Sequence, residues 1–178
     1  RILGLYMSEA GHIASEGADL QAVDRALVDF GMPMGPFRLM DEVGLDVAEH
    51  VSPILVQGLG DRFRSDNFGL TGKMVKAGML GKKSGKGFYV YENGRSKGFN
   101  EELPSLLGTE GRRFNSLKKK ATEVVDRCVL QMINEATRIL EEGIVERPEE
   151  LDLAMVMGTG FAPFRGGLLS YADSLGTQ

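Results

Sequence analysis

Two glycine-rich stretches of the chain have residue types that could bind phosphate. The first runs from Gly81 to Gly87 (GKKSGKG) and joins a flexible backbone to three lysines, but Lys86 stands where a nucleotide phosphate loop needs glycine. The second, Gly158 to Pro163 (GTGFAP), starts like a dinucleotide-binding fingerprint. It has proline in place of the third glycine, and the residues before it have the pattern of a helix rather than a strand. We interpret the second stretch as a helix end, and two readings of the first stay open: a solvated basic loop or a phosphate contact.

Charged side chains recur at matching positions in the two halves of the chain. Only one half could face an active site, yet both halves keep these residues. We therefore expect a repeated internal ion-pair or capping scheme rather than catalysis. The matching pairs are Glu9 with Glu135, Asp24 with Asp152, Arg38 with Arg165, and Asp41 with Asp173.

Other residues that commonly do chemistry are few. Cys128 is the one cysteine, so an internal disulfide is excluded. His12 and His50 are the only histidines, and neither has a partner at the spacing of a catalytic triad or a metal site. We expect no metal in this chain and an ordinary surface or core position for both histidines.

Composition and charge narrow the class of protein. The 178 residues are 42% hydrophobic, which is enough for a packed core. Lys and Arg total 21 against 25 Asp and Glu, and the net charge of −4 gives no field that would attract nucleic acid or an anionic membrane. We recognise no membrane span and no leader peptide in the pattern. A soluble protein of a reducing, intracellular compartment is expected.

The chain is organised around an internal repeat. Most of Gly31 to Gly44 (GMPMGPFRLMDEVG) returns as Gly160 to Gly176 (GFAPFRGGLLSYADSLG), and Arg1 to Ala10 aligns with Arg127 to Ala136. A period this long indicates a duplicated domain rather than a solenoid. Each copy is too short to bury its apolar face well alone, so we expect the two to pack about a pseudo-twofold axis. No capping residue precedes the helix expected at Arg1, which indicates a piece of a longer polypeptide.

Glycine and aspartate set the predicted ends of the first helices. One helix should end at Gly17, and Asp19 should cap a second that stops at Gly31. Asp46 should cap a later helix with an inward apolar face. The residues expected on that face are Val47, Val51, Ile54 and Leu55.

The rest of the pattern is helical except for one hairpin. Residues 88–91, which are aromatic and β-branched, precede Asn93-Gly94, the strongest hairpin signal in the chain. The fold class is therefore mainly α with one small β-hairpin. Further helices are expected at 36–43, 71–77, 101–107, 116–142, 148–157 and 163–175. We divide the chain into a first copy at 1–95, a linker at 96–113 and a second, shorter copy at 114–178.

Several motifs together carry a family resemblance. The chain contains GMPMGPFR (31–38) followed by DEVGLD (41–46), then GKKSGKGFY (81–89), then GTGFAPFRGG (158–167). This series resembles the C-terminal region of 3-hydroxyacyl-CoA dehydrogenases and covers nearly the whole chain. The tandem copy is similar to multifunctional fatty-acid oxidation proteins that fuse enoyl-CoA hydratase to this dehydrogenase. The resemblance implies two copies of a 6-phosphogluconate-dehydrogenase-C-terminal-like helical domain, packed as single-copy relatives pack in their dimers.

The resemblance also implies an activity for the parent protein. That activity is NAD-dependent oxidation at C3 of an L-3-hydroxyacyl-CoA in fatty-acid β-oxidation. The family's catalytic His and Glu lie in a nucleotide-binding domain that nothing here matches, and a family Asn near the substrate carbonyl would fall just ahead of Arg1. The second copy has Asp126 at that position, which indicates that only the first copy faced substrate. We assign no catalytic or cofactor-binding residue to this chain, place NAD in the parent enzyme, and expect the chain alone to be inactive.

Candidate substrate contacts follow from the same resemblance. An apolar, partly rigid loop at a helix start suits either an acyl-chain contact or structural packing, and lysines could approach the phosphates of coenzyme A. The apolar candidates are Met32, Pro33, Met34, Pro36 and Phe37, and the basic candidates are Lys82 and Lys83, with Lys73, Lys76 and Lys86 as further lysines.

Partners and alternative functions complete the expectations. The expected partners are acyl-CoA, the protein's own N-terminal NAD-binding domain and, as an open option, a thiolase subunit, in the cytoplasm or in a eukaryotic mitochondrion or peroxisome. One alternative is an interaction module that docks a hydratase or thiolase partner, which predicts an exposed apolar patch. Another is a stand-alone acyl-CoA binder, which predicts affinity for acyl-CoA without NAD.

Overall fold

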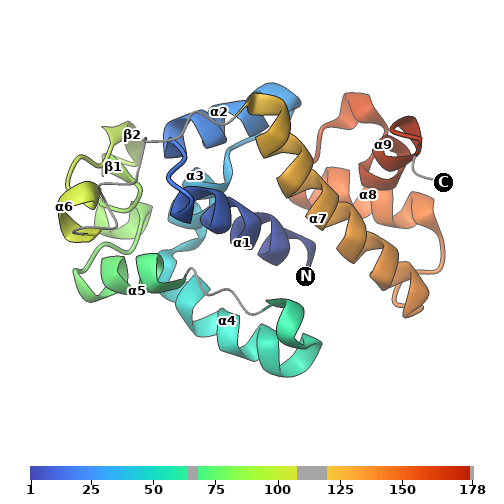
Figure 1. Ribbon diagram of the computed structural model, residues 1–178, viewed down its shortest axis with the longest axis horizontal. Helices are drawn as coiled ribbons and strands as arrows, with labels where there is room; N and C mark the ends of the chain where they lie inside the picture. The colour runs from blue at the N-terminus through green and yellow to red at the C-terminus, as the bar shows by residue number, and fades with distance from the viewer. Residues whose placement is uncertain (64–67, 108–119, 177–178) are drawn as a thin grey trace.

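The computed structural model describes residues 1–63, 68–107 and 120–176. Within these ranges the protein is mainly helical, with one two-stranded antiparallel hairpin (Figure 1). The predicted fold class is confirmed. Among the described helices, none has both the length and the apolar character of a membrane span.

The first repeat opens with three helices whose ends follow the predicted caps. They are α1 (Ile2–Ser15), α2 (Leu20–Phe30) and α3 (Pro36–Val43). The Asp19 carboxylate accepts hydrogen bonds from the backbone nitrogens of Gln21 and Ala22 at 2.8 and 3.1 Å, which confirms Asp19 as the cap of α2. Gly31 ends α2 at a φ of +124°, a conformation that favours glycine. Pro36 is the first residue of α3, where its missing N–H costs nothing.

The fourth helix corrects one predicted cap. α4 (Leu45–Leu59) begins one residue before Asp46, and its N-cap is Gly44 at a φ of +103°. Because Gly44 both ends α3 and starts α4, Asp46 falls in the first turn, where it pairs with Lys83 instead of capping. The predicted inward face is also mostly wrong, since Val47, Val51 and Ile54 are 41%, 37% and 55% exposed.

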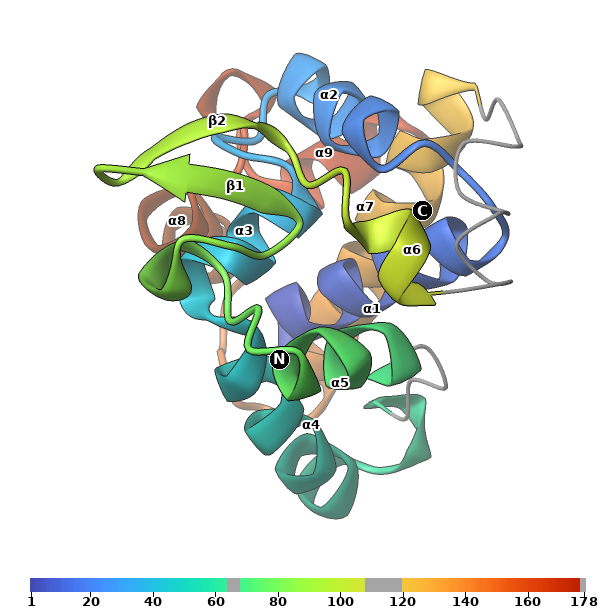
Figure 2. The same ribbon diagram turned by 90° about the vertical axis from the view of Figure 1, so that its left-hand side faces the viewer.

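The predicted hairpin is confirmed. It consists of β1 (Tyr89–Glu92) and β2 (Arg95–Phe99), flanked by α5 (Phe68–Lys76) and α6 (Leu103–Leu107). Asn93 and Gly94 both have positive φ, as a tight hairpin turn requires. Figure 2 shows the hairpin on the side of the molecule that carries α2 and α3. Two 3₁₀ turns, η1 (Asp61–Phe63) and η2 (Lys82–Ser84), complete this half.

The second repeat has the same order of helices but a different entry to the last one. Its elements are α7 (Ala121–Glu141), α8 (Pro148–Thr159), η4 (Pro163–Arg165) and α9 (Leu168–Ser174). The helix predicted from Pro163 is wrong at its start, because Gly166 and Gly167 have positive φ and interrupt the chain after one 3₁₀ turn. The part of the predicted 116–142 helix at 116–119 lies outside the described residues.

Buried aspartates play the same role in both repeats. Asp24 accepts hydrogen bonds from the backbone nitrogens of Phe37 and Arg38 at 2.9 and 3.2 Å, at the start of α3. Asp152 does the same for Leu169 and Ser170 at 2.6 and 3.0 Å, at the start of α9. The predicted capping role of this pair is confirmed.

Two of the other predicted pairs are not equivalent. Asp41 is buried whereas Asp173 is exposed. Arg38 is exposed, whereas the Arg165 guanidinium lies 4.0 Å from the centre of the Phe30 ring. The shift from η4 to α9 explains the difference between the arginines, because the capping by Asp152 makes Ser170, rather than Arg165, the counterpart of Arg38. The aspartates differ because the partners of Asp41 are Phe88, Tyr89 and Tyr91, which belong to the hairpin region of the first repeat.

The repeats pack on each other chiefly through α1 and α7, which cross in the middle of the molecule (Figure 1). Buried residues of both helices, such as Tyr6 and Met132, belong to one hydrophobic cluster. The contact is bordered by ion pairs that repeat with the two halves exchanged. Arg1 binds Glu135 and Glu142 at 2.5 and 2.6 Å, and Arg127 binds their counterparts Glu9 and Glu16 at 2.6 and 2.8 Å. This exchange is what an approximate twofold axis requires.

Candidate functional site

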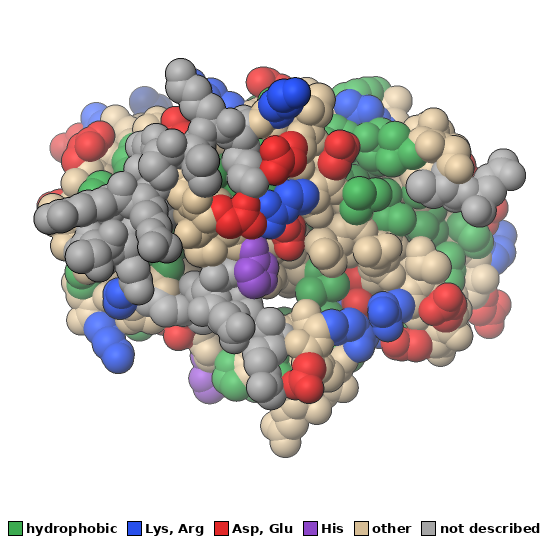
Figure 3. Space-filling model, viewed as in Figure 1, with side chains coloured by type: hydrophobic (Ala, Val, Ile, Leu, Met, Phe, Trp, Pro, Cys, Tyr) green, Lys and Arg blue, Asp and Glu red, His purple; other side chains and the backbone are tan. Residues whose placement is uncertain are grey.

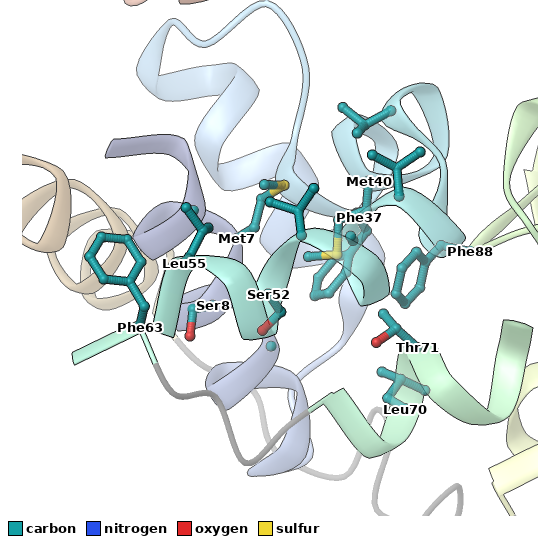
Figure 4. A pocket seen from close by; sticks show the side chains of 16 residues that line it. Met7, Ser8, Phe37, Met40, Ser52, Leu55, Phe63, Leu70, Thr71 and Phe88 are labelled. Atoms are coloured by element: carbon teal, nitrogen blue, oxygen red, sulfur yellow. The ribbon is translucent and has the colours of Figure 1, made fainter. Parts of the chain in front are cut away.

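An apolar pocket opens in the first repeat, between α1, α3, α4 and α5. Its volume is about 150 Å³. Met7 and Ser8 of α1 line it together with Phe37 and Met40 of α3, and Figure 4 shows their side chains around it. Most other lining residues are also hydrophobic, so the pocket suits an uncharged, apolar ligand group.

Small residues on α1 make room for this pocket. A Cβ added at Gly4 would lie 3.5 Å from Leu55 Cδ1 and 3.6 Å from Phe63 Cε1, in ordinary van der Waals contact. The counterpart of Gly4 in the second repeat is Leu130, at the interval that relates Arg1 to Arg127. A leucine at this position of α1 would fill part of the pocket.

One end of the pocket is closed by two aromatic rings. Phe37 and Phe88 are buried, and their ring centres lie 4.9 Å apart. Figure 4 shows these rings at the opposite end of the pocket from Phe63 and Leu55. The Asp24 carboxylate accepts a hydrogen bond from the Phe37 nitrogen, so the capping of α3 also fixes this wall.

Two buried carboxylates and two tyrosines next to these rings join the hairpin to α2 and α3. The Tyr89 hydroxyl donates to Asp24 at 2.7 Å, and the Tyr91 hydroxyl donates to Asp41 at 3.0 Å. Asp41 also accepts from the backbone nitrogens of Phe88 and Tyr89, both at 2.9 Å. This cluster positions the pocket wall without touching the pocket.

Burial changes how these groups titrate. Loss of solvation raises the pKa of Asp24 and of Asp41 to about 6, although hydrogen bonds from the tyrosines and the backbone oppose the shift. Burial and the neighbouring carboxylates raise the pKa of Tyr89 and Tyr91 well above the usual range. At neutral pH the tyrosines therefore donate and the aspartates accept.

The pocket opens beside α4, next to the basic loop. Val43, Val47 and Val51 line the pocket and are between 37% and 47% exposed. Lys83 lies against Gly44, within this rim, and pairs with Asp46, whose pKa it lowers. Exposed ion pairs of this kind contribute little to stability and exchange partners readily.

Three of the predicted basic residues form ion pairs on the surface, and the partners of Lys82 and Lys83 are sequence neighbours of the pocket residues Val43 and Val47. Lys82 binds Glu42 at 2.8 Å, Lys83 binds Asp46, and Lys86 binds Glu102 at 2.5 Å. Lys73 and Lys76 lie on α5.

Of the predicted apolar contacts, Phe37 lines the pocket and the others lie elsewhere. Met32 is buried ahead of α3, and Pro36 is buried as the first residue of that helix. Pro33 packs on the second repeat, where a Cβ added at Gly160 would come within 2.8 Å of Pro33 Cγ. Met34 is half-buried in the same loop. The loop from Met32 to Pro36 therefore joins the repeats and positions α3.

Sequence reasoning missed most of the pocket. It did not single out Gly4, Met40 or Phe88. The Val47, Val51 and Leu55 stripe was expected to be core, whereas these residues line the pocket. The signal that could have found them is a glycine in α1 facing this stripe, because a helix interior tolerates glycine at a cost and its use there indicates a need for space.

The glycine run that imitates a dinucleotide fingerprint does not fit NAD. Gly158 and Thr159 are the last residues of α8, and Gly160 ends that helix in the left-handed conformation. A dinucleotide site needs this run between a strand and a following helix. The reading of these glycines as a helix end is confirmed. In the described residues no cluster of His, Cys, Asp and Glu has the geometry of a metal site.

Comparison with known proteins identifies the family. The model of the 3-hydroxyacyl-CoA dehydrogenase C-terminal domain matches residues 1–91 and 124–178. The chain belongs to this family. The two matched segments lie within the ranges 1–95 and 114–178 expected for the two copies.

Relatives of the 3-hydroxyacyl-CoA dehydrogenase C-terminal family agree with this assignment. The chain is 45% identical to fatty acid oxidation complex subunit alpha of Shewanella amazonensis over 99% of its own length, and 43% identical to that of Shewanella baltica. It spans about a quarter of these relatives, 24% in each case.

Solved structures share the fold. 3-Hydroxybutyryl-CoA dehydrogenase from Escherichia coli K12 superposes with a TM-score of 0.74 at 21% identity, covering 98% of this chain and 52% of the other. The dehydrogenase part of multifunctional enzyme 1 from C. elegans gives a TM-score of 0.69 at 24% identity, covering 89% of this chain and 35% of the other.

Proposed function

We propose that this chain forms the acyl-binding wall of an NAD-dependent 3-hydroxyacyl-CoA dehydrogenase that acts in fatty-acid β-oxidation. The observation that carries the proposal is the apolar pocket of the first repeat, with Lys82 and Lys83 paired to Glu42 and Asp46, the sequence neighbours of its lining residues Val43 and Val47. The parent reaction removes a hydride from C3 of an L-3-hydroxyacyl-CoA. The NAD-binding domain and the acid/base pair of the parent enzyme would lie outside these 178 residues. The parent enzyme would act in the cytoplasm, or in a mitochondrion or peroxisome if it is eukaryotic.

The pocket and its rim suit the two chemically different parts of an acyl-CoA. The acyl tail would lie among Met7, Phe37 and Met40, where it loses contact with water. Lys82 and Lys83 would exchange their surface carboxylates for phosphate oxygens of the coenzyme. An exposed lysine pair loses little when its partner changes, because such ion pairs contribute only about 0 to 1 kcal/mol.

The residues of this chain would bind and orient rather than react. Phe37 contacts the tail directly, while Met32, Pro33, Met34 and Pro36 act by fixing the start of α3 against the second repeat. The closed wall excludes water from the tail and holds it in one direction, so that the thioester end faces out of the pocket.

The test of this role is charge reversal at the rim. Lys82→Glu combined with Lys83→Glu should weaken binding of an acyl-CoA about tenfold and leave binding of the corresponding free fatty acid nearly unchanged. Calorimetry without NAD measures both affinities. Lys97→Glu, a reversal in β2, is the matched control. Equal acyl-CoA affinity in the Lys82/Lys83 variant and the control would remove the lysines from the site.

A docking role is the second candidate, because the second repeat exposes large apolar residues. Met157 is 78% and Phe164 is 75% exposed, and Leu153 lies one turn before Met157 on α8. On α2 the counterparts of Leu153 and Met157 are the charged residues Arg25 and Asp29. The second repeat therefore has an apolar face at a place where the first repeat is charged. Figure 3 shows hydrophobic side chains gathered over the α8 and α9 side of the molecule.

The occupant of that face would be the protein's own NAD-binding domain or a thiolase subunit. Replacing Leu153 and Met157 by Arg and Asp, the residues of the first repeat, should leave acyl-CoA affinity of the chain unchanged and weaken assembly of the parent complex. Analytical ultracentrifugation of the intact complex reads this out. Unchanged assembly would leave the apolar face without a docking role.

A further inference from the structure

The pocket of the first repeat is open on one side and closed at one end. Val47 and Val51 of α4 line the open side and are more than a third exposed. Phe37 and Phe88 form the closed end, and each is at most 1% exposed. Figure 4 shows the two rings together at that end. A linear chain that enters beside α4 and runs towards α3 is therefore stopped by two aromatic rings.

The backbone behind these rings is held firmly. Asp24 fixes the Phe37 nitrogen and Asp41 fixes the Phe88 nitrogen, both at 2.9 Å. The carbonyl oxygen of Phe88 accepts a further hydrogen bond from the Asn100 nitrogen at 2.9 Å. Because Phe88 is tied on both sides of its Cα, its backbone cannot withdraw without breaking buried hydrogen bonds, and the ring can leave this end only by changing rotamer within the packed core.

The size of the pocket limits what fits in front of the rings. An apolar cavity of about 150 Å³ holds a benzene-sized group, which corresponds to roughly six carbons. Each methylene that leaves water contributes to binding, whereas a methylene that remains outside contributes almost nothing. Affinity should therefore rise with chain length only until the chain reaches the wall.

We propose that the pair Phe37 and Phe88 sets the length of acyl chain that this protein selects. The inference rests on the proposed function, since it assumes that the pocket takes the acyl tail, and it adds the residues that determine specificity. Phe88 lies between η2 and β1, so this loop becomes a specificity element. The preferred ligands are acyl groups with about six carbons inside the pocket.

The test is a chain-length series on the 178-residue chain. Saturated acyl-CoAs from butanoyl to dodecanoyl are titrated by calorimetry. With the wild-type chain, affinity should increase about fourfold for each added methylene and then stop increasing. With Phe88→Ala, the increase should continue for about two further methylenes, because the ring no longer blocks the end. Phe88→Leu, which removes less volume and is less disruptive to folding, should shift the plateau by a smaller amount.

Val51→Ala is the matched control, because it removes apolar contact at the open side. It should weaken binding of all chain lengths by a similar factor and leave the plateau at its wild-type length. A plateau that stays in place in both folded Phe88 variants overturns this inference and leaves the proposed function intact. Absence of acyl-CoA binding by the wild-type chain at every length overturns the proposed function and this inference with it.

Discussion

Arg1 donates a hydrogen bond to Glu135 across the contact between the two repeats, with 2.5 Å between Arg1 Nε and Glu135 Oε1. The same bond with the repeats exchanged joins Arg127 Nε to Glu9 Oε1 at 2.7 Å. The two arginines lie 126 positions apart in the chain (127 − 1), and so do the two glutamates (135 − 9). The two halves therefore pack like the protomers of a twofold dimer, with α1 and α7 at the axis.

The two copies of this ion pair should differ in strength. Glu135 is completely buried and also binds Arg62 at 3.0 Å, whereas Glu9 keeps 14% of its side chain exposed. Although burial raises the pKa of Glu135, hydrogen bonds from Arg62 and Arg1 bring it below the usual value, so this residue is charged at neutral pH. Glu135→Gln should lower the free energy of unfolding by about 3 kcal/mol.

The matched control is Glu9→Gln, which should cost about 1 kcal/mol because water replaces part of the lost interaction. Urea unfolding at neutral pH gives both values. Equal losses at the two positions would mean that burial of Glu135 does not strengthen its bonds.

The close approach of α2 to the start of α3 makes Gly35 irreplaceable. A Cβ at Gly35 would lie 2.3 Å from Asp24 Cγ and 2.4 Å from Asp24 Cα, so backbone would have to move. Gly35→Ala should lower the free energy of unfolding by at least about 2 kcal/mol. Gly58→Ala in α4, where a Cβ meets nothing within 4 Å, should instead stabilise by about 0.5 to 1 kcal/mol. Thermal unfolding followed by circular dichroism tests the pair, and a mild effect at Gly35 would contradict the packing described.

Buried Asp24 and Asp41 predict an unusual pH dependence of stability. Their pKa is about 6 in the folded protein, above the ordinary value of 3.8. Between these values the folded state holds more protons than the unfolded state, so the free energy of unfolding should rise as the pH falls from 7 to 5. The expected gain is a few kcal/mol for the two residues together, on the order of 1.4 kcal/mol for each unit of pKa shift.

Urea unfolding at several pH values between 5 and 7 measures this slope. Asp41→Asn removes one of the two titrating groups and should flatten the profile. A wild-type stability that falls towards pH 5 would show that the hydrogen bonds from Tyr89 and Tyr91 outweigh burial.

The hairpin and several helix boundaries could be predicted because they depend on local signals. Asp19 caps α2, Pro36 opens α3 and Asn93-Gly94 turns the hairpin, and each acts through its own backbone preference. Asp46 was mispredicted as a cap because Gly44 can end one helix and start the next, which is a matter of chain direction rather than of residue type.

The candidate site was harder to predict because it depends on contacts between distant residues. Phe37 was found, but Phe88 reaches the pocket only because Asp41 draws the hairpin onto α3. Pro33 was expected near the ligand, whereas it packs on the second repeat beside Gly160. Hydrophobic residues of a pocket and of a core have the same periodicity, so the sequence pattern alone does not separate them.

The central claim, that the first repeat binds an acyl chain in this pocket, is tested most directly by filling the pocket. Gly4→Leu introduces the residue that the second repeat has at the same position, and leucine suits a helix better than glycine. Calorimetry with hexanoyl-CoA should show binding by the wild-type chain and at least about tenfold weaker binding by Gly4→Leu, since the added side chain occupies the space of several methylenes. Equal affinities in the two folded proteins would contradict the account.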